Sequence, residues 1–255
     1  MDFQDRVAII TGAAGGIGSA CVKKFYDNGA KVALLDIREE LCEKTVEKLG
    51  LDKERVLCLA GDLADEEQVR GLVEKVVAHF GTVDILVNTA GIQGPTARIE
   101  EYKYEDMKKI MNINFFGTLL MMHYTLPVMQ AKGKGAIVNF GSCSGMFGYT
   151  FEVAYGASKA AIIEITKTAA AENGVNGVRI NSISPGWVDT GMYREVMESY
   201  KGNGFEDPTD NIVLGPMERP ATPMEMANCV AFLCSDEASF VNGCNFVADG
   251  GKTIC

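Results

Sequence analysis

The sequence predicts an α/β fold, a doubly wound parallel sheet covered by helices on both faces. Short apolar runs rich in Val, Ile and Leu alternate along the whole chain with amphipathic stretches of about ten to twenty residues. The apolar runs are nearly continuous, which is typical of parallel strands that are buried on both faces. Because strands and helices alternate strictly, right-handed crossovers are expected. No linker, repeat or low-complexity tract divides residues 1–255, so we expect one dinucleotide-binding catalytic domain.

The strands are assigned to the short β-branched and apolar runs of the chain. They are expected at 6–11, 31–36, 55–62, 83–88, 135–140, 178–184 and 244–249. Helices are expected between them at 16–28, 39–49, 65–79, 104–131, 154–173 and 223–234. Residues 191–218 mix Gly, Pro, acidic and aromatic residues with weak periodicity. A long irregular segment of this kind is a functional lid or a disordered loop, and we favour a lid.

Charge and hydropathy exclude several classes of partner. The formal net charge of −10 does not suit nucleic acid or an anionic membrane, because both attract basic surfaces. No apolar run approaches the roughly 18 residues that span a bilayer. The first ten residues lack the apolar core of a secretory signal. We therefore expect a cytoplasmic protein without a membrane or nucleic-acid partner.

The eight cysteines are scattered, and no two of them have C-x-x-C spacing. Buried free thiols are the expected state of such cysteines in a protein without a secretory signal. His79 and His123 are the only histidines, and neither lies near a pair of cysteines. No metal site is therefore expected.

The first predicted strand runs into the sequence TGAAGGIG, and a predicted helix follows it. Gly12, Gly16 and Gly18 permit a tight turn, the close approach of a diphosphate to the backbone, and close packing of the helix on the sheet. The helix N-terminus then faces the anion. A glycine cluster alone can also be a flexible turn, but its position between strand and helix favours a dinucleotide site.

Asp36 ends the second predicted strand, eighteen residues beyond Gly18. A carboxylate at this distance accepts hydrogen bonds from the adenosine ribose hydroxyls and repels a 2′-phosphate. NAD is therefore expected as the cofactor in preference to NADP. The nearby Arg38 leaves some use of NADP open, because a guanidinium can bind a phosphate.

Two more turns follow predicted strands at the same edge of the sheet. GDL follows the third strand and NTAG follows the fourth, and ligands bind at the carboxyl ends of strands in open α/β sheets. Each turn could also be a capped turn with no further role. The cofactor contacts expected here are Asp62, Leu63, Asn88, Ala90 and Gly91.

The predicted helix that contains AYGASKAAIIEI carries Tyr155 and Lys159, which share one face at a spacing of four residues. A tyrosine has an ordinary pKa of about 10, so it needs a shift of roughly three units to act as a base near neutral pH. A neighbouring ammonium favours the phenolate and supplies part of that shift. The pair could instead extend from an apolar helix into solvent without a catalytic role.

Two motifs upstream decide between these interpretations. Ser142 lies in NFGSCSG, thirteen residues before Tyr155, and Asn114 lies in MNINFFGT. With TGAAGGIG, NTAG, YGASK, PGWVDT and DGG in this order, nearly the whole chain resembles the classical short-chain dehydrogenase/reductase family. AGIQGP, AYGASKAAII and SISPGW are similar to segments of the bacterial xylitol and polyol dehydrogenases of that family.

The resemblance implies a Rossmann fold with a seven-stranded parallel sheet, bound NAD and a homotetramer. Tyr155 would be the general acid/base, and Lys159 would lower its pKa and bind the nicotinamide ribose. Ser142 would orient the substrate oxygen, and Asn114 would hold a water of the proton relay. Further cofactor contacts are expected from Ile17, Pro185, Gly186, Val188 and Thr190, the last two at the nicotinamide carboxamide.

The chain departs from the family pattern at two positions. Thr89 replaces the second Asn of the usual Asn-Asn-Ala-Gly, and its hydroxyl can still form a hydrogen bond. Cys143 beside Ser142 is unusual, and we expect it to serve packing. GSCSG also imitates a hydrolase elbow, but that fold places its histidine after the nucleophile, and both histidines here precede Cys143. An NAD-binding sensor on the same fold is a further alternative, although it would be expected to lack Tyr, Lys or Ser.

We therefore predict an NAD-dependent oxidoreductase that interconverts a secondary alcohol and a ketone. A polyol or another small secondary alcohol is the preferred substrate, and a hydroxysteroid or a 3-oxoacyl thioester is the alternative. The predicted helices 104–131 and 154–173 carry wider apolar faces than one sheet needs. In the family these helices form the main subunit interface, so the resemblance implies a homotetramer, and the sequence alone does not distinguish it from a dimer. The residues expected to face the substrate are Gln93, Met146, Tyr149, Trp187, Met192 and Tyr193.

Overall fold

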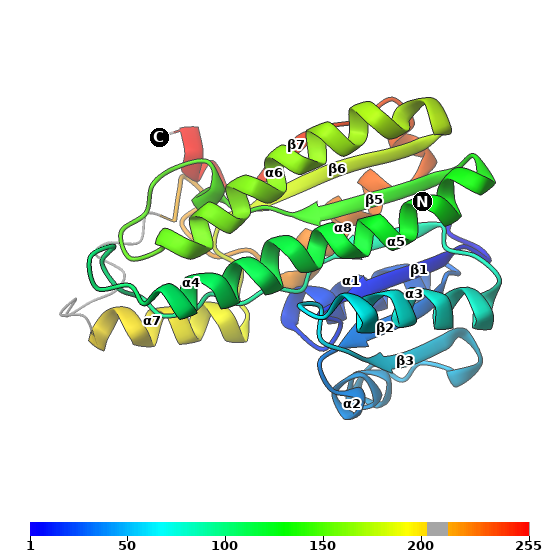
Figure 1. The fold of residues 1–255 in the computed structure, drawn as a ribbon, viewed down its shortest axis with the longest axis horizontal. Coiled ribbons are helices and arrows are strands. Elements are labelled where there is room, and N and C mark those ends of the chain that lie inside the picture. The colour runs from blue at the N-terminus through cyan, green and yellow to red at the C-terminus, as the bar shows by residue number, and fades with distance from the viewer. Residues whose placement is uncertain (203–213, 255) are drawn as a thin grey trace.

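A computed structural model describes residues 1–202 and 214–254 of the chain. Its seven strands form one sheet in the order β3-β2-β1-β4-β5-β6-β7, and every neighbouring pair is parallel (Figure 1). The predicted doubly wound parallel sheet is confirmed. Each strand begins and ends within two residues of its prediction. The strands are β1 Val7–Thr11, β2 Lys31–Asp36, β3 Val56–Ala60, β4 Ile85–Asn88, β5 Gly135–Phe140, β6 Val178–Pro185 and β7 Asn245–Ala248.

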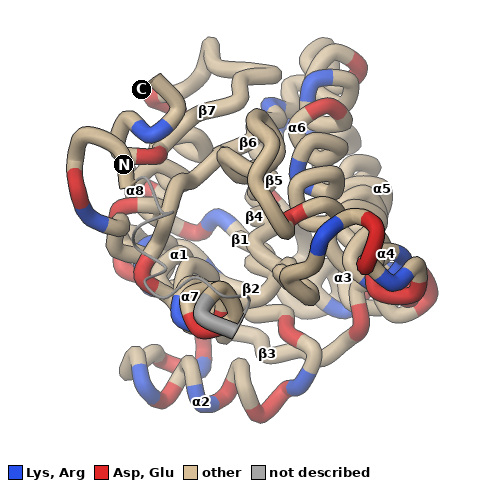
Figure 2. The backbone as a smooth tube through the Cα atoms, turned by 90° about the vertical axis from the view of Figure 1, so that its left-hand side faces the viewer, with Lys and Arg blue, Asp and Glu red and all other residues tan. Residues whose placement is uncertain are grey.

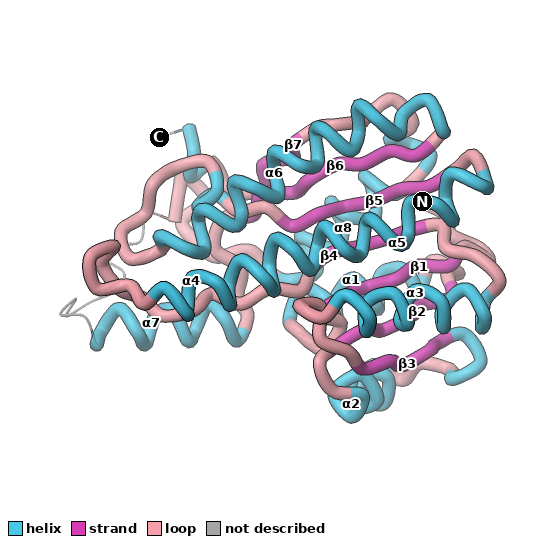
Figure 3. The backbone as a smooth tube through the Cα atoms, in the orientation of Figure 1, coloured by secondary structure: helices cyan, strands magenta, loops and turns pink. Residues whose placement is uncertain are grey.

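Helices cover both faces of this sheet (Figures 1 and 3). Helices α1, α2 and α8 pack on one face, while α3, α5 and α6 pack on the other. The longer loops gather with α4 and α7 at the carboxyl end of the strands (Figure 3). The helices are α1 Gly16–Asp27, α2 Glu39–Leu49, α3 Glu66–Phe80, α4 Tyr104–Ile110, α5 Gly117–Lys132, α6 Val153–Asn173, α7 Gly191–Gly202 and α8 Pro223–Cys234.

The core lies in two layers because successive strand side chains point to opposite faces. In β1, Ala8 and Ile10 pack with α1 and α8, whereas Val7 and Ile9 pack with α3 and α5. All four side chains are almost completely buried. This double burial explains why the strand sequences are continuous apolar runs instead of alternating ones.

Local signals in the sequence fix several helix ends. Thr222 caps α8 in a capping box with Glu225, and Pro223 occupies the first turn, where its missing N–H costs nothing. Helix α3 begins after Asp65, whose side chain accepts the N–H of Gln68 at 3.1 Å. These caps place the helices where the hydrophobic pattern predicts them.

The structure changes two of the predicted elements. The predicted helix 104–131 is α4, a π-helical turn at Met111–Phe116, and α5, which together run from residue 104 to 132. The predicted irregular segment 191–218 is wrong for residues 191–202, because they form α7. Thr190 caps α7 by accepting the N–H of Tyr193 at 3.3 Å, a signal that is hidden within the PGWVDT motif. Residues 203–213 of that segment lie outside the described residues.

Most charged residues lie on the outer helices (Figure 2). In the described part of the chain, no helix is both long enough and apolar enough to cross a membrane. The seven described cysteines are all free thiols, as the sequence predicts, and Cys255 lies outside the described residues.

A buried amide pair joins the centre of the sheet to the helices in front of it. Asn88, at the end of β4, donates its side-chain N–H to the side-chain amide oxygen of Asn139 on β5 at 2.9 Å. Asn139 in turn donates to the Thr166 hydroxyl on α6 at 3.0 Å and to the Met122 sulfur on α5 at 3.2 Å. Asn88 is 2% exposed and is not among the residues that line the cavity described below, so its contact with a cofactor stays a prediction.

We expect Asn139→Ala to lower the free energy of unfolding by about 2–4 kcal/mol, because it leaves the buried Asn88 amide and Thr166 hydroxyl without their partner. The loss is measured by urea denaturation followed by circular dichroism. Glu172→Ala, at an exposed position of α6, is the control and should change stability by less than about 0.5 kcal/mol. Equal losses in both variants would show that the amide pair is not a structural constraint.

Candidate active site

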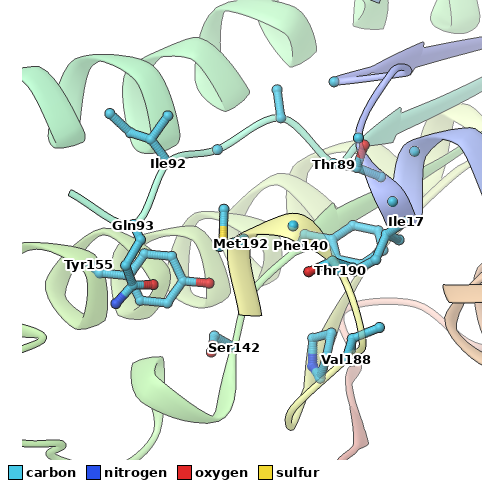
Figure 4. Close-up of a pocket in the computed structure, with 18 of the residues that line it drawn as sticks. Ile17, Thr89, Ile92, Gln93, Phe140, Ser142, Tyr155, Val188, Thr190 and Met192 are labelled. Carbon is cyan, nitrogen blue, oxygen red and sulfur yellow. The ribbon is translucent and has the colours of Figure 1, made fainter. Parts of the chain in front are cut away.

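A cavity of about 720 Å³ opens at the carboxyl ends of the strands. It lies where the strand order reverses between β1 and β4, which is the usual ligand position in doubly wound sheets. Figure 4 shows Tyr155 and Ser142 on one side of this cavity, with Val188 and Thr190 on the other. Twenty of the residues predicted from the sequence line it: Gly12, Gly16, Ile17, Gly18, Asp36, Asp62, Leu63, Ala90, Gly91, Gln93, Ser142, Tyr155, Lys159, Pro185, Gly186, Trp187, Val188, Thr190, Met192 and Tyr193.

The turn after β1 is packed so closely that it requires glycine. Gly12 has a φ of +59°, and a Cβ there would lie 2.8 Å from the Ala90 Cα. A Cβ on Gly18 would lie 2.1 Å from the Gly12 carbonyl oxygen. The turns after β1 and β4 are therefore in direct contact, and the first turn of α1 faces the cavity with free backbone N–H groups.

Asp36 closes one end of the cavity. Its carboxylate accepts the Ala14 N–H at 3.0 Å and the Ile37 N–H at 2.9 Å, so the side chain is fixed by the backbone on both sides. Each carboxylate oxygen keeps a further lone pair that can accept a hydrogen bond from a ligand hydroxyl. Arg38 is exposed and is not among the residues that line the cavity.

Ser142 and Tyr155 lie together on the wall formed by β5 and α6. Ser142 follows β5, is 9% exposed, and accepts the Ser144 N–H at 3.1 Å. Burial raises the pKa of the Tyr155 phenol, and the Glu152 carboxylate raises it further, while a hydrogen bond with Ser142 opposes both effects. Tyr155 is therefore held in its protonated form at neutral pH in the chain alone.

Lys159 lies beneath the tyrosine on the next turn of α6. It is 4% exposed, and its ammonium donates to the Phe140 carbonyl oxygen at 2.8 Å. Its Nζ is 5.5 Å from the centre of the Tyr155 ring, and burial lowers the pKa of Lys159 to about 8. The sequence predicts that Lys159 lowers the pKa of Tyr155, and this role stays a prediction, because in the chain alone burial and Glu152 raise that pKa.

Asn114 lies in the π-helical turn but does not line the cavity. Its side chain accepts the Ile92 N–H at 2.8 Å and donates to the Ile92 carbonyl oxygen at 3.0 Å and to the Ser158 hydroxyl at 3.1 Å. The amide is thus used to tie the loop after β4 to α6. π-helical turns are frequent at functional sites because they displace one residue from the helical register.

Two predicted substrate contacts lie outside the cavity. Met146 is 40% exposed, and its sulfur accepts a hydrogen bond from the Asn245 amide at 3.3 Å. The Tyr149 ring packs against the Lys252 ammonium, with 4.3 Å between Nζ and the ring centre. Their places near Ser142 in the sequence suggested contact with substrate, but the short helical turn at Cys143–Gly145 directs the chain away.

The two departures from the family pattern are accommodated locally. The Thr89 hydroxyl donates to the Thr11 carbonyl oxygen, so it joins the turns after β1 and β4. Cys143 is 2% exposed, and burial raises the pKa of its thiol to about 12. This thiol is therefore a packing group rather than a nucleophile.

Several residues that line the cavity are missing from the sequence prediction. The most unexpected are Glu152, three residues before Tyr155, and Lys252, just after the terminal DGG. Glu152 lies at the start of α6, where an acidic residue is ordinarily a solvated partner of the helix dipole. Its spacing of three from Tyr155 was the available signal. The other missed residues include Ala14, Gly15, Ile92, Ser144 and Val196.

Comparison with known proteins agrees with this geometry. A family model described as enoyl-(acyl carrier protein) reductase matches residues 12–253. The chain is 34% identical over 251 residues to the cyclohexanol dehydrogenase of Acinetobacter sp. (strain SE19), across 98% of this chain and 96% of that protein. It is 38% identical over 255 residues to the D-threitol dehydrogenase of Mycolicibacterium smegmatis, across 99% and 95%. The chain belongs to the short-chain dehydrogenase/reductase family.

Solved structures of similar proteins share the whole fold of this short-chain dehydrogenase/reductase. Levodione reductase superposes with a TM-score of 0.94 at 33% identity, over 99% of both chains. NAD⁺-bound xylitol dehydrogenase superposes with a TM-score of 0.92 at 34% identity, over 98% of this chain and 100% of that one. The NADP-bound protein ElxO superposes with a TM-score of 0.89 at 31% identity, over 98% and 99%. The chain is accordingly an oxidoreductase that acts on alcohols with a nicotinamide cofactor.

The affinity of this short-chain dehydrogenase/reductase for NADH should fall when a side chain is added to the glycine turn after β1. We expect Gly18→Ala to weaken NADH binding at least tenfold, because its Cβ would lie 2.1 Å from the Gly12 carbonyl oxygen. Binding is measured by NADH fluorescence titration. Gly71→Ala is the matched control, since it lies in α3 with open space around the added methyl and should stabilise the fold by up to about 1 kcal/mol. Unchanged NADH affinity in Gly18→Ala would contradict the role of this turn.

Proposed function

We propose that the protein is an NAD-dependent dehydrogenase that interconverts a small secondary alcohol or polyol and the corresponding ketone, with Tyr155 as the general acid/base. The observation that carries the proposal is the convergence of Tyr155, Ser142 and Lys159 on one cavity whose far end is formed by Asp36 and the glycine turn. A reacting group and a dinucleotide can therefore occupy the same cavity.

The residues of the cavity fit a dinucleotide. The glycine turn lets backbone N–H groups approach a diphosphate, and Asp36 supplies carboxylate oxygens for ribose hydroxyls. When bound, the nicotinamide accepts a hydride from the alcohol carbon or returns it to the ketone carbon. Val188 and Thr190 line the cavity near Ile17 and are proposed to hold the carboxamide (Figure 4).

We assign the proton transfer to Tyr155. In alcohol oxidation its phenolate accepts the hydroxyl proton, and in ketone reduction its phenol donates one. Ser142 is proposed to donate a hydrogen bond to the substrate oxygen, which stabilises the negative charge that develops there. Because the pKa of Tyr155 is raised in the chain alone, the acid form is present at neutral pH, and oxidation should become faster as the pH rises.

Lys159 and Asn114 are proposed to assist this proton transfer, the first by its charge and the second by its position. Lys159 uses one N–H on the Phe140 carbonyl oxygen, so two remain for the ribose and for stabilising the phenolate. The Asn114 amide is engaged by Ile92 and Ser158. We therefore propose that Asn114 positions the loop and helix α6, in place of the water-holding role expected from the sequence.

Two observations support a small alcohol as the substrate class. The family relatives include proteins named cyclohexanol dehydrogenase and D-threitol dehydrogenase. Trp187, Met192 and Tyr193 line the substrate end of the cavity and reduce the space beside Tyr155. Hydroxysteroids and 3-oxoacyl thioesters are the alternatives, and both are larger than the substrates that these names describe. An NADH-formation screen of polyols, small diols, steroid alcohols and 3-hydroxyacyl thioesters tests the choice.

We also propose a homotetramer that uses α5 and α6. Phe116 and Leu119 are 46% and 37% exposed at the start of this helical surface. Ala157 and Ala160 on α6 are exposed as well, so the two helices present small and apolar side chains outward. Exposed apolar surface of this kind is typical of subunit interfaces. For α7 we propose a lid over the substrate end of the cavity, because its residues Met192, Tyr193 and Val196 line it.

Tyr155→Phe should lower kcat at least a hundredfold in both directions, because general acid/base catalysis contributes about 10²–10⁴-fold. Turnover is measured as NADH formation or consumption at several pH values. The wild-type oxidation rate should rise with pH as the phenol loses its proton, and the variant should lose this dependence. Tyr104→Phe, at a 69% exposed position, is the control and should behave as wild type. A Tyr155→Phe protein with full turnover would refute the mechanism.

Asp36→Ala should remove the preference for NAD. The wild type should use NAD with a kcat/KM at least tenfold above that for NADP, because the carboxylate repels a 2′-phosphate. In the variant, kcat/KM for NAD should fall and the ratio should approach one. Asp62→Ala is the comparison, because this carboxylate also lines the cavity but should not discriminate at the 2′-position. Wild-type activity with NADP alone would contradict the assignment of Asp36.

A further inference from the structure

Glu152 brings a carboxylate into the substrate end of the cavity. It is 7% exposed and lines the cavity beside Gln93 and Tyr155. Its Oε1 accepts a hydrogen bond from the Tyr200 hydroxyl at 3.5 Å. Its Oε2 is closed to solvent and has no donor in hydrogen-bond geometry among the described residues, while hydrogen bonds from the Ser144 and Gln93 side chains to the carboxylate lower its pKa. A buried carboxylate oxygen without a donor is costly, so this atom has an unmet need for a hydrogen-bond donor.

A second polar group of the same cavity is also unsatisfied. Trp187 lines the cavity, and its indole N–H is buried without an acceptor among the described residues. Glu152 and Trp187 both line the cavity, and each has one buried polar atom without a partner among the described residues. A hydroxyl group is both a donor and an acceptor, so a ligand with several hydroxyls can satisfy both positions.

Lys252 sets the charge of this wall. Its ammonium lies 4.3 Å from the centre of the Tyr149 ring and 4.6 Å from that of the Trp187 ring. Burial raises the pKa of Glu152, while the Ser144 hydrogen bond and the Lys252 charge oppose that rise. No ion pair within 4.0 Å joins Lys252 and Glu152 in the described part of the chain. The two opposite charges therefore face the cavity separately.

The position of Glu152 relates it to the reacting group. It precedes Tyr155 by three residues, so the two side chains leave neighbouring turns of the chain at the start of α6. The Glu152 carboxylate also acts electrostatically on the Tyr155 phenol. A substrate whose reacting hydroxyl meets Tyr155 would therefore present adjacent carbons to Glu152.

We infer that Glu152 is a specificity-determining residue that accepts a hydrogen bond from a second hydroxyl of the substrate, so the preferred substrates are neutral diols and polyols. This inference rests on the proposed function, because it assumes that an alcohol reacts at Tyr155. A substrate carboxylate at the position of the second hydroxyl would be repelled by Glu152. A mono-alcohol would leave the Oε2 atom without a donor.

The test compares two alcohols of the same carbon skeleton. meso-2,3-Butanediol has the second hydroxyl and 2-butanol lacks it, so the ratio of their kcat/KM values, measured as NADH formation, reports that hydroxyl alone. We expect the wild-type ratio to exceed ten. Glu152→Ala should lower the ratio at least tenfold, mainly through KM for the diol. Glu152→Gln keeps a carbonyl oxygen as acceptor and should lower the ratio less.

The ratio separates specificity from indirect effects. Loss of the Glu152 charge also changes the pKa of Tyr155, but that change affects both alcohols and cancels in the ratio. Glu164→Gln removes a charge from the exposed face of the same helix and should leave the ratio unchanged. Thermal unfolding and NADH binding of each variant show that fold and cofactor site are retained.

Each outcome decides the inference. A ratio near one in the wild type, equal losses for both alcohols in Glu152→Ala, or a preference for a hydroxy acid over the diol would overturn it while leaving an alcohol dehydrogenase in place. Absence of NADH formation with every alcohol would instead refute the proposed function. A fall in the ratio, with partial recovery in Glu152→Gln, would establish Glu152 as the anchor of the second hydroxyl.

Discussion

The contact between the turns after β1 and β4 is the constraint on which the rest of the structure depends. Gly12 approaches Ala90 so closely that no side chain fits, and Thr89 joins the two turns by a hydrogen bond. Because β1 and β4 are neighbours at the reversal of strand order, this contact sets the floor of the cavity. The proposed dinucleotide site on one side and Ser142 and Tyr155 on the other are placed relative to that floor.

The start of α6 balances several electrostatic effects within one turn of helix. Burial and Glu152 favour the neutral phenol of Tyr155, and Ser142 favours its anion. Lys159 is itself buried enough that its pKa falls to about 8, so its charge is also held only weakly. The pKa of Lys159 is thus displaced toward neutrality and that of Tyr155 away from it, so the phenol keeps its proton until a bound ligand changes these surroundings.

The sequence predicts the regular elements well because the strand and helix patterns are strong. Runs such as those of β2 and β5 are mostly apolar, and their bounds are predicted correctly. The prediction fails where a residue has a second structural role that its local sequence does not indicate. Thr190 is both a site residue and the cap of α7, and Asn88 resembles a turn former although it is a buried strand end. Glu152 looks like an ordinary acidic residue of a helix start, and only the fold shows that it is buried.

The Asn114 clamp has a consequence for how this fold can change. One side chain holds both backbone groups of Ile92 and the Ser158 hydroxyl, so the loop after β4 is fastened to α6 at a single point. Exposed residues of this loop beyond that point, such as Ile99 and Glu100, can accept substitutions with little displacement of the helix that carries Tyr155. The clamp thereby separates the loop after β4, whose exposed residues can vary, from helix α6, which must keep its geometry.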